Sequence, residues 1–135
     1  MAWKAAVYLC VLAVGTMTAG PATDSVKIPP EPKYDPGSVI DFGAVVMEVR
    51  EVAKGNPLAG LHLEVKNDSD ATMSVYLGPT EFIESFGLTF RKGDNLHITG
   101  SKVRNSGDSI VLAREVRRDS ATLYLRNRNG DPYWH

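Results

Sequence analysis

The chain has 135 residues, of which 43% are hydrophobic, and this size and composition suit one domain with an ordinary core. Its 15 Lys and Arg residues nearly balance its 16 Asp and Glu residues, so the composition lacks the excess positive charge of a nucleic-acid binder. The single cysteine, Cys10, excludes a disulfide scaffold and a zinc site built from several cysteines. We therefore expect no nucleic-acid partner and no cysteine chemistry.

Residues 1–22 have the pattern of a signal peptide. Lys4 precedes an apolar run over residues 5–14, and small residues follow where a signal peptidase could cut, after Gly20 or Ala22. The apolar run is shorter than the roughly 20 residues that a membrane-spanning helix needs. The sequence therefore predicts a periplasmic or secreted protein. A buried N-terminal helix or an uncleaved anchor is the alternative.

Residues 23–37 are rich in proline and predict a linker ahead of a domain at residues 38–135. Four prolines lie within eight residues, at positions 29, 30, 32 and 36. Such a segment is expected to be extended and polyproline-like. We expect it to act as a spacer; a docking motif for an aromatic groove on a partner is the alternative.

The segment Ser38–Val52 predicts a long first strand that bends. Ile40 and Phe42 share one face, whereas the alternate apolar residues at 45, 47 and 49 share the other. A bulge at Gly43-Ala44 would swap the two faces. A long bent strand that serves both halves of a barrel is what closure of a small barrel requires.

Two shorter strands and a helix follow the first strand. Gly60–Lys66 and Ala71–Leu77 each alternate apolar and polar residues, which is the period of a strand with one buried face. Pro79–Phe86 predicts a short helix with an apolar stripe, and Gly87 is a natural stop. We expect the phenylalanines of this stripe, Phe82 and Phe86, to be deeply buried and to plug one end of the barrel.

Three further strands are predicted, at residues 95–103, 110–116 and 122–126. The fifth has consecutive apolar residues at 110–113, as expected of a strand that is bulged or buried on both faces. Asn129-Gly130 is a strong hairpin signal that would fold Tyr133 and Trp134 back onto the sixth strand. The predicted fold is all-β: a five-stranded OB-fold-like barrel with one short helix between strands three and four, plus a C-terminal β-hairpin.

Several turn and core motifs carry a resemblance that runs from about Tyr34 to Trp134. They comprise residues 75–79, Gly87, Phe90, residues 92–94, residues 99–101, Leu123, Leu125, residues 129–130, Pro132 and Trp134. In these motifs the chain resembles a group of small exported bacterial proteins of uncharacterised function. In layout it also resembles the bacterial OB-fold family of periplasmic stress-tolerance proteins. The OB resemblance implies a ligand surface on strands two and three and their flanking loops.

The predicted ligand surface consists of polar side chains that face away from the core by strand parity or lie in the neighbouring loops. Its candidate residues are His62, Glu64, Ser74, Tyr76, Asn56 and Asn105. Of these, Tyr76 is the best single candidate, because it offers an apolar ring and a hydroxyl. Its truncation to Ala is expected to weaken binding and to leave stability nearly unchanged.

The sequence gives little support for metal binding or catalysis. His62 and Glu64 lie two residues apart and could both reach one ion, but no third ligand accompanies them, so we expect a solvated pair and no metal. The chain contains no nucleophile elbow, phosphate loop or zinc-protease helix. We therefore expect no catalytic residues, no cofactor and no enzymatic activity.

Two functions remain open. The first is an exported, non-catalytic binding module that uses the predicted ligand surface. The second is a structural or accessory subunit of a larger extracytoplasmic or membrane-associated assembly, docked through the linker and the terminal aromatics Tyr133 and Trp134. The plainer interpretation of Trp134 is that it caps the open end of the barrel.

Overall fold

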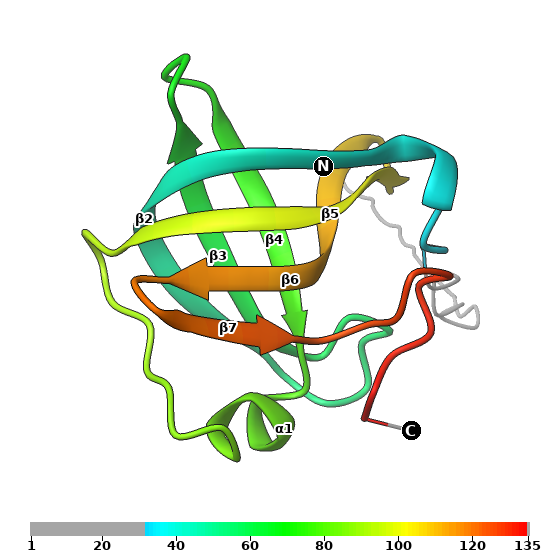
Figure 1. Ribbon diagram of the computed structural model, residues 1–135. Coiled ribbons are helices and arrows are strands. Elements are labelled where there is room, and N and C mark those ends of the chain that lie inside the picture. The colour runs from blue at the N-terminus through cyan, green and yellow to red at the C-terminus, as the bar shows by residue number, and fades with distance from the viewer. Residues whose placement is uncertain (1–31, 135) are drawn as a thin grey trace, which may run out of the picture.

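Six strands and one short α-helix make up the described part of the chain, residues 32–134, in this computed structural model (Figure 1). The predicted signal peptide and residues 23–31 of the predicted linker lie outside the described residues. A 3₁₀ turn, η3 (Pro36–Ser38), precedes the first strand. The other elements, in chain order, are β2 (Val39–Val52), β3 (Gly60–Asn67), β4 (Thr72–Gly78), α1 (Thr80–Glu84), β5 (Asn95–Asn105), β6 (Asp108–Arg118) and β7 (Ala121–Tyr124).

The strands β2 to β6 form a closed barrel. Antiparallel pairing runs in the order β4-β3-β2-β5-β6, and a short parallel pairing between β4 and β6 closes the ring at Val75↔Val111 and Tyr76↔Leu112. In the chain, the helix α1 falls between β4 and β5, and it lies below the barrel in Figure 1. The predicted all-β fold is confirmed: it is a closed five-stranded barrel with one short helix between the third and fourth barrel strands of the chain and an extra strand, β7, at the C-terminal side.

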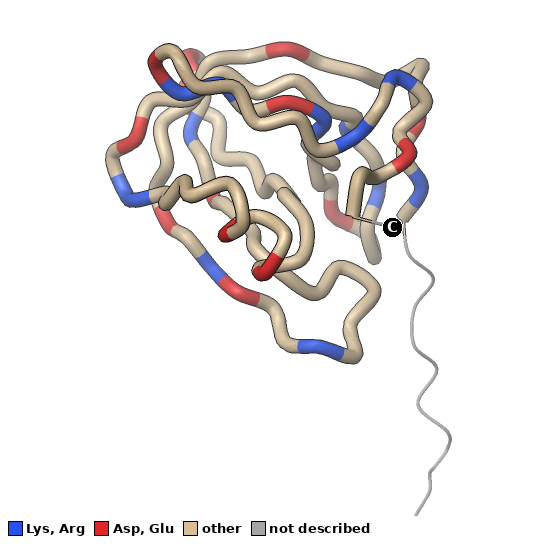
Figure 2. The backbone as a smooth tube through the Cα atoms, turned by 60° about the horizontal axis from the view of Figure 1, so that its bottom comes forward, with Lys and Arg blue, Asp and Glu red and all other residues tan. Residues whose placement is uncertain are grey.

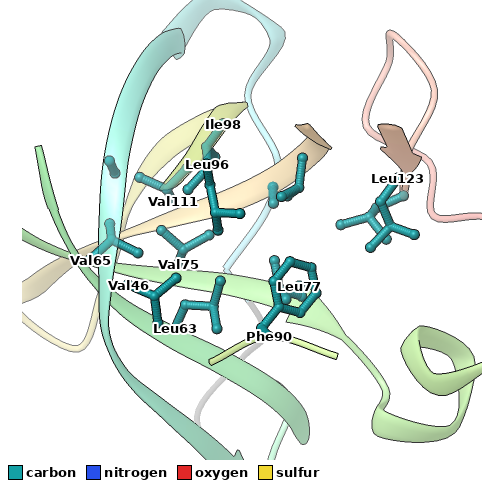
Figure 3. Packing of buried hydrophobic residues seen from close by; sticks show 14 of the residues in the cluster. Val46, Leu63, Val65, Val75, Leu77, Phe90, Leu96, Ile98, Val111 and Leu123 are labelled. Carbon is teal, nitrogen blue, oxygen red and sulfur yellow. The ribbon is translucent and has the colours of Figure 1, made fainter. Parts of the chain in front are cut away.

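Alternating side chains of the five strands fill the barrel with apolar residues (Figure 3). Leu63 and Val65 of β3 and Val75 of β4 are fully buried, as the alternation of apolar and polar residues in these strands predicts. The strand β6, which is the fifth strand of the barrel along the chain, is buried on both faces. Val111 packs in the barrel core, whereas Leu112 belongs to a second cluster outside it. This explains its consecutive apolar residues.

The bend of the first strand lies later than predicted. Ala44 and Val46 point into the core on the same face as Phe42, while Val45 and Met47 are exposed, so the predicted swap of faces at Gly43-Ala44 is wrong. The register with β3 shifts between Val46 and Glu48, not at Gly43-Ala44. The three consecutive apolar residues at 45–47 made either parity possible, and a sequence pattern of period two cannot choose between them.

The helix is shorter than predicted and a different side chain plugs the barrel. Ile83 is buried in the core, whereas Phe82 is half-buried and Phe86 is 44% exposed, so the expectation that both phenylalanines are deeply buried is wrong. With only one helical turn and a half, α1 can direct one side chain into the barrel end, and the smaller Ile83 takes that position. Gly87 ends the segment with a positive φ of 73°, as expected.

A second apolar cluster, here called the outer cluster, covers one outer face of the barrel. Its buried members are Leu58, Tyr76, Ile110 and Leu112, with Tyr34, Val103 and Trp134 packed against them. Its residues come from the β2–β3 loop, the barrel strands and both ends of the described part of the chain. That face is therefore shielded from solvent by segments that are remote in sequence.

The two ends of the described chain pack on the barrel rather than leaving it. Asp35 donates its backbone N–H to Ser101 Oγ at 2.9 Å, so the described end of the predicted linker is fixed to β5. At the other end, Arg126 and Pro132 form an isolated antiparallel bridge, and Tyr133 donates its N–H to Leu125 O. The returning segment around Asn129-Gly130 thus exists, although its second arm is a bridge and not a full strand. Within residues 32–134, no helix is long and apolar enough to cross a membrane.

Candidate functional site

A polar groove opens where β4 and β6 separate ahead of their parallel pairing. It encloses a volume of about 500 Å³, within the range of small-ligand sites. We call this groove the seam groove. Its polar rim consists of Arg50, Glu64, Ser74, Lys102, Asn105 and Asp108, with Thr72 and Ser109 beside them. Met73, Ile110 and Val111 supply its apolar part.

The charges of the seam groove balance. Arg50 Nη2 lies 2.6 Å from Glu64 Oε2, so this cation and this anion already satisfy each other. Lys102 and Asp108 add one further charge of each sign. A groove with balanced charges and several hydroxyl and amide groups suits a neutral polar or zwitterionic ligand better than a strongly charged one.

The structure brings together three of the six predicted ligand residues. Glu64 and Ser74 face each other across β3 and β4, and Asn105 closes the β5–β6 hairpin beside them. Sequence reasoning missed Arg50 and Lys102 as groove residues. No local signal identified them, because they come from β2 and β5 and reach the groove only once the barrel has closed.

The other three predicted ligand residues hold the β2–β3 loop in place. Asn56 accepts the N–H of Leu58 through Oδ1 at 2.9 Å, which fixes the loop in an Asx turn. His62 donates from Nε2 to Leu58 O at 2.7 Å, and Tyr76 donates its hydroxyl to Ala59 O at 3.0 Å. His62 is 6% exposed and Tyr76 is 3% exposed, so neither is the solvated side chain that parity indicated.

Burial also controls the protonation of His62. Its pKa is lowered from the usual 6.5, first because burial penalises the charged ring and also because Arg50 repels it. The hydrogen bond to Leu58 and the nearby Glu64 act in the opposite direction but do not outweigh burial. Burial therefore favours the neutral form of His62, and the tautomer with its proton on Nε2 makes the hydrogen bond to Leu58 O. Among residues 32–134, no group of three or more metal-ligating side chains is found.

The terminal aromatics have different environments. Trp134 lies edge-on to Tyr76 at 6.3 Å between ring centroids and 5.4 Å from Phe82, and Arg126 lies over its ring. It therefore packs against both the barrel core and the outer cluster. Tyr133 is 54% exposed and offers its ring to solvent.

Comparison with models of protein families identifies the family of this chain. Residues 38–123 match the model of the MamS/MamX magnetosome protein family, and this match covers more than half of the chain. The chain belongs to the MamS/MamX magnetosome protein family. Comparisons with curated proteins and with solved structures find no match.

The MamS/MamX match runs from the start of the barrel to β7. It includes every residue of the seam groove and ends before Tyr133 and Trp134. The resemblance to small bacterial proteins is thus confirmed at the level of a bacterial magnetosome family. Membership of the periplasmic OB-fold family stays a prediction, because only the layout of the barrel supports it.

Proposed function

We propose that this MamS/MamX protein is a non-catalytic accessory subunit of a magnetosome-associated assembly outside the cytoplasm. The observation that carries the proposal is the family match, which extends over the entire barrel. The exposed ring of Tyr133, on a segment fixed by hydrogen bonds, supports a role in contacting another protein. The signal-peptide pattern of residues 1–22 supports the location.

A tagged copy in the native host tests this function. We expect the protein to be enriched in isolated magnetosomes and to recover a protein partner in a stoichiometric amount in a native pull-down. An even distribution through the cytoplasmic fraction, with no partner recovered, would contradict the proposal.

A second candidate, a small-ligand binding module, is favoured by the seam groove. Glu64, Ser74 and Asn105 converge there around a volume of about 500 Å³ with balanced charge. Free amino acids and neutral sugars are suitable probes, titrated against the purified protein while backbone amide NMR shifts are recorded. Binding at the groove should shift amides of β3, β4 and the β5–β6 turn.

Matched variants separate groove binding from incidental contact. Asn105→Ala should weaken binding of an active probe about tenfold, the scale of one lost contact residue. Asn95→Ala changes an exposed Asn at the other end of the same strand and should leave it unchanged. Equal effects of both variants would dismiss the groove as a ligand site.

A further inference from the structure

A hollow beside β7 combines arginines with exposed tyrosines. We call it the tyrosine–arginine hollow, and it is lined by Arg114, Arg126, Arg128, Tyr124 and Tyr133. It encloses about 370 Å³ and lies apart from the seam groove, with which it shares no residue. Its components come from β6, from the end of β7 and from the C-terminal segment.

Basic and acidic residues are interspersed along the chain (Figure 2), whereas the residues that line the hollow are mainly basic among those that carry charge. Three arginines line it against one acidic residue, Glu115. Glu115 Oε2 lies 3.5 Å from Arg114 Nε and offsets that cation in part. Arg126 is buried, donates from Nη1 to Gly130 O, and lies over the rings of Tyr34 and Trp134, so its charge is fixed at the base. Arg128 is exposed at the rim.

Two aromatic rings flank these cations. Tyr124 is 57% exposed and Tyr133 is 54% exposed, which makes them the two most exposed large apolar side chains among those described. Tyr and Arg are the residue types enriched where protein interfaces bind most strongly. A free inorganic anion would use the arginines but would leave both rings in water, so a larger ligand fits this surface better.

The loop that carries Arg128 is ordered before any ligand arrives. Asn127 Oδ1 accepts the N–H groups of Asn129 and Asp131, and Asn127 Nδ2 donates to Asp131 Oδ2 at 3.0 Å. Tyr133 is fixed by its own N–H, which donates to Leu125 O. A preformed surface loses less conformational entropy on binding, which favours affinity.

We propose that the tyrosine–arginine hollow binds a segment of a protein partner that is rich in Asp or Glu. The segment's carboxylates face Arg114 and Arg128, and its aliphatic groups pack on Tyr124 and Tyr133. Charge complementarity selects this partner class, because guanidinium groups pair with carboxylates in bidentate geometry. This inference rests on the proposed accessory function and names the kind of partner that the assembly supplies.

Peptide titration tests the hollow directly. The purified protein is titrated with a ten-residue peptide that alternates Glu and Leu, with a second peptide in which Gln replaces every Glu, and with an oligothymidylate. We expect the Glu peptide to bind, to shift amides of residues 124–133, and to bind less tightly as salt rises. Equal affinity of the Gln peptide, or tighter binding of the oligothymidylate, would overturn the proposal.

Charge-matched variants locate the binding. Arg128→Glu should weaken the Glu peptide about tenfold, and Tyr133→Ala should do so to a similar extent. Arg91→Glu makes the same charge change at an exposed residue of the α1–β5 loop and should have little effect. If Arg128→Glu does not fold, Arg128→Ala replaces it. An equal loss with Arg91→Glu would show that net charge, and not the hollow, governs binding.

The native pull-down distinguishes the two proposals. If wild-type protein recovers its partner and Arg128→Glu loses it, both proposals are supported. If Arg128→Glu still recovers the partner at the wild-type level, the hollow is not the docking site, while the accessory function stands. If wild-type protein recovers no partner and is absent from magnetosomes, the accessory function itself fails.

Discussion

Tyr76 shows how burial changes the meaning of a side chain. Parity places it on the outer face of β4, yet the β2–β3 loop and Trp134 cover that face. Its ring also packs on His62, with 5.0 Å between centroids. The sequence predicted that truncating Tyr76 leaves stability nearly unchanged. Because the side chain is buried, we expect its truncation to destabilise the protein.

We expect Tyr76→Ala to lower the free energy of unfolding by about 3–5 kcal/mol, the scale for truncating a buried aromatic. Tyr76→Phe should cost about 1 kcal/mol, because the hydrogen bond to Ala59 O is lost while the ring stays in place. Urea denaturation measures both. A Tyr76→Ala variant as stable as the wild type would show that the outer cluster contributes nothing to folding.

His62 predicts a pH dependence of stability. Its folded-state pKa lies below the unfolded value of about 6.5, so the unfolded chain binds the proton more readily. The stabilisation is present above pH 6.5 and is lost as the pH falls through the folded-state pKa. Urea denaturation between pH 7.5 and 5 should show this loss in the wild type and a smaller loss in His62→Gln. Parallel pH profiles would mean that His62 does not titrate differently on folding.

At the scale of elements, α1 contributes one fully buried residue to the barrel core. Ile83 is buried at the barrel end, and Phe86 rests on the outside against Phe82. Ile83→Ala should cost about 2–5 kcal/mol, whereas Phe86→Ala should cost less than about 1 kcal/mol. Thermal and urea denaturation of the two variants compare these costs. If Phe86→Ala lowered the free energy of unfolding more than Ile83→Ala, Phe86 and not Ile83 would be the residue that plugs the barrel.

At the scale of the whole molecule, the C-terminal segment has two separable roles. Trp134 joins the barrel core to the outer cluster, so Trp134→Ala should lower the free energy of unfolding by about 3 kcal/mol or more. Tyr133→Ala should stay within about 0.5 kcal/mol of the wild type and should reduce recovery of a partner. Denaturation and the native pull-down, run on both variants, check the separation. Loss of the partner in a fully stable Trp134→Ala variant would contradict it.

Export can also be tested on the intact protein. The signal-peptide pattern predicts a mature N-terminus between Gly20 and Thr23, because small residues precede these cleavage positions. N-terminal sequencing of the protein isolated from its host measures this. A soluble cytoplasmic species that still begins at Met1 or Ala2 would disprove export.

The barrel could be predicted from the sequence because its determinants are local. Alternation in β3 and β4, turns at glycines and a short helix between two strands are each visible within about ten residues. Placing the bend of β2 required its neighbours: three consecutive apolar residues fit either face, and the register with β3 decided it.

The sites required the tertiary structure. The seam groove takes Arg50 and Lys102 from strands that are distant in sequence, and only barrel closure places them beside Glu64 and Ser74. Strand parity gives the direction of a side chain but not what covers it, so His62 and Tyr76 faced outward and were nevertheless buried. The sequence by itself therefore determined the succession of strands along the chain, the short helix between two of them, and the barrel class. The packing of loops and chain ends on its surface decided which polar residues stayed open to a ligand, because that packing depends on contacts between remote segments.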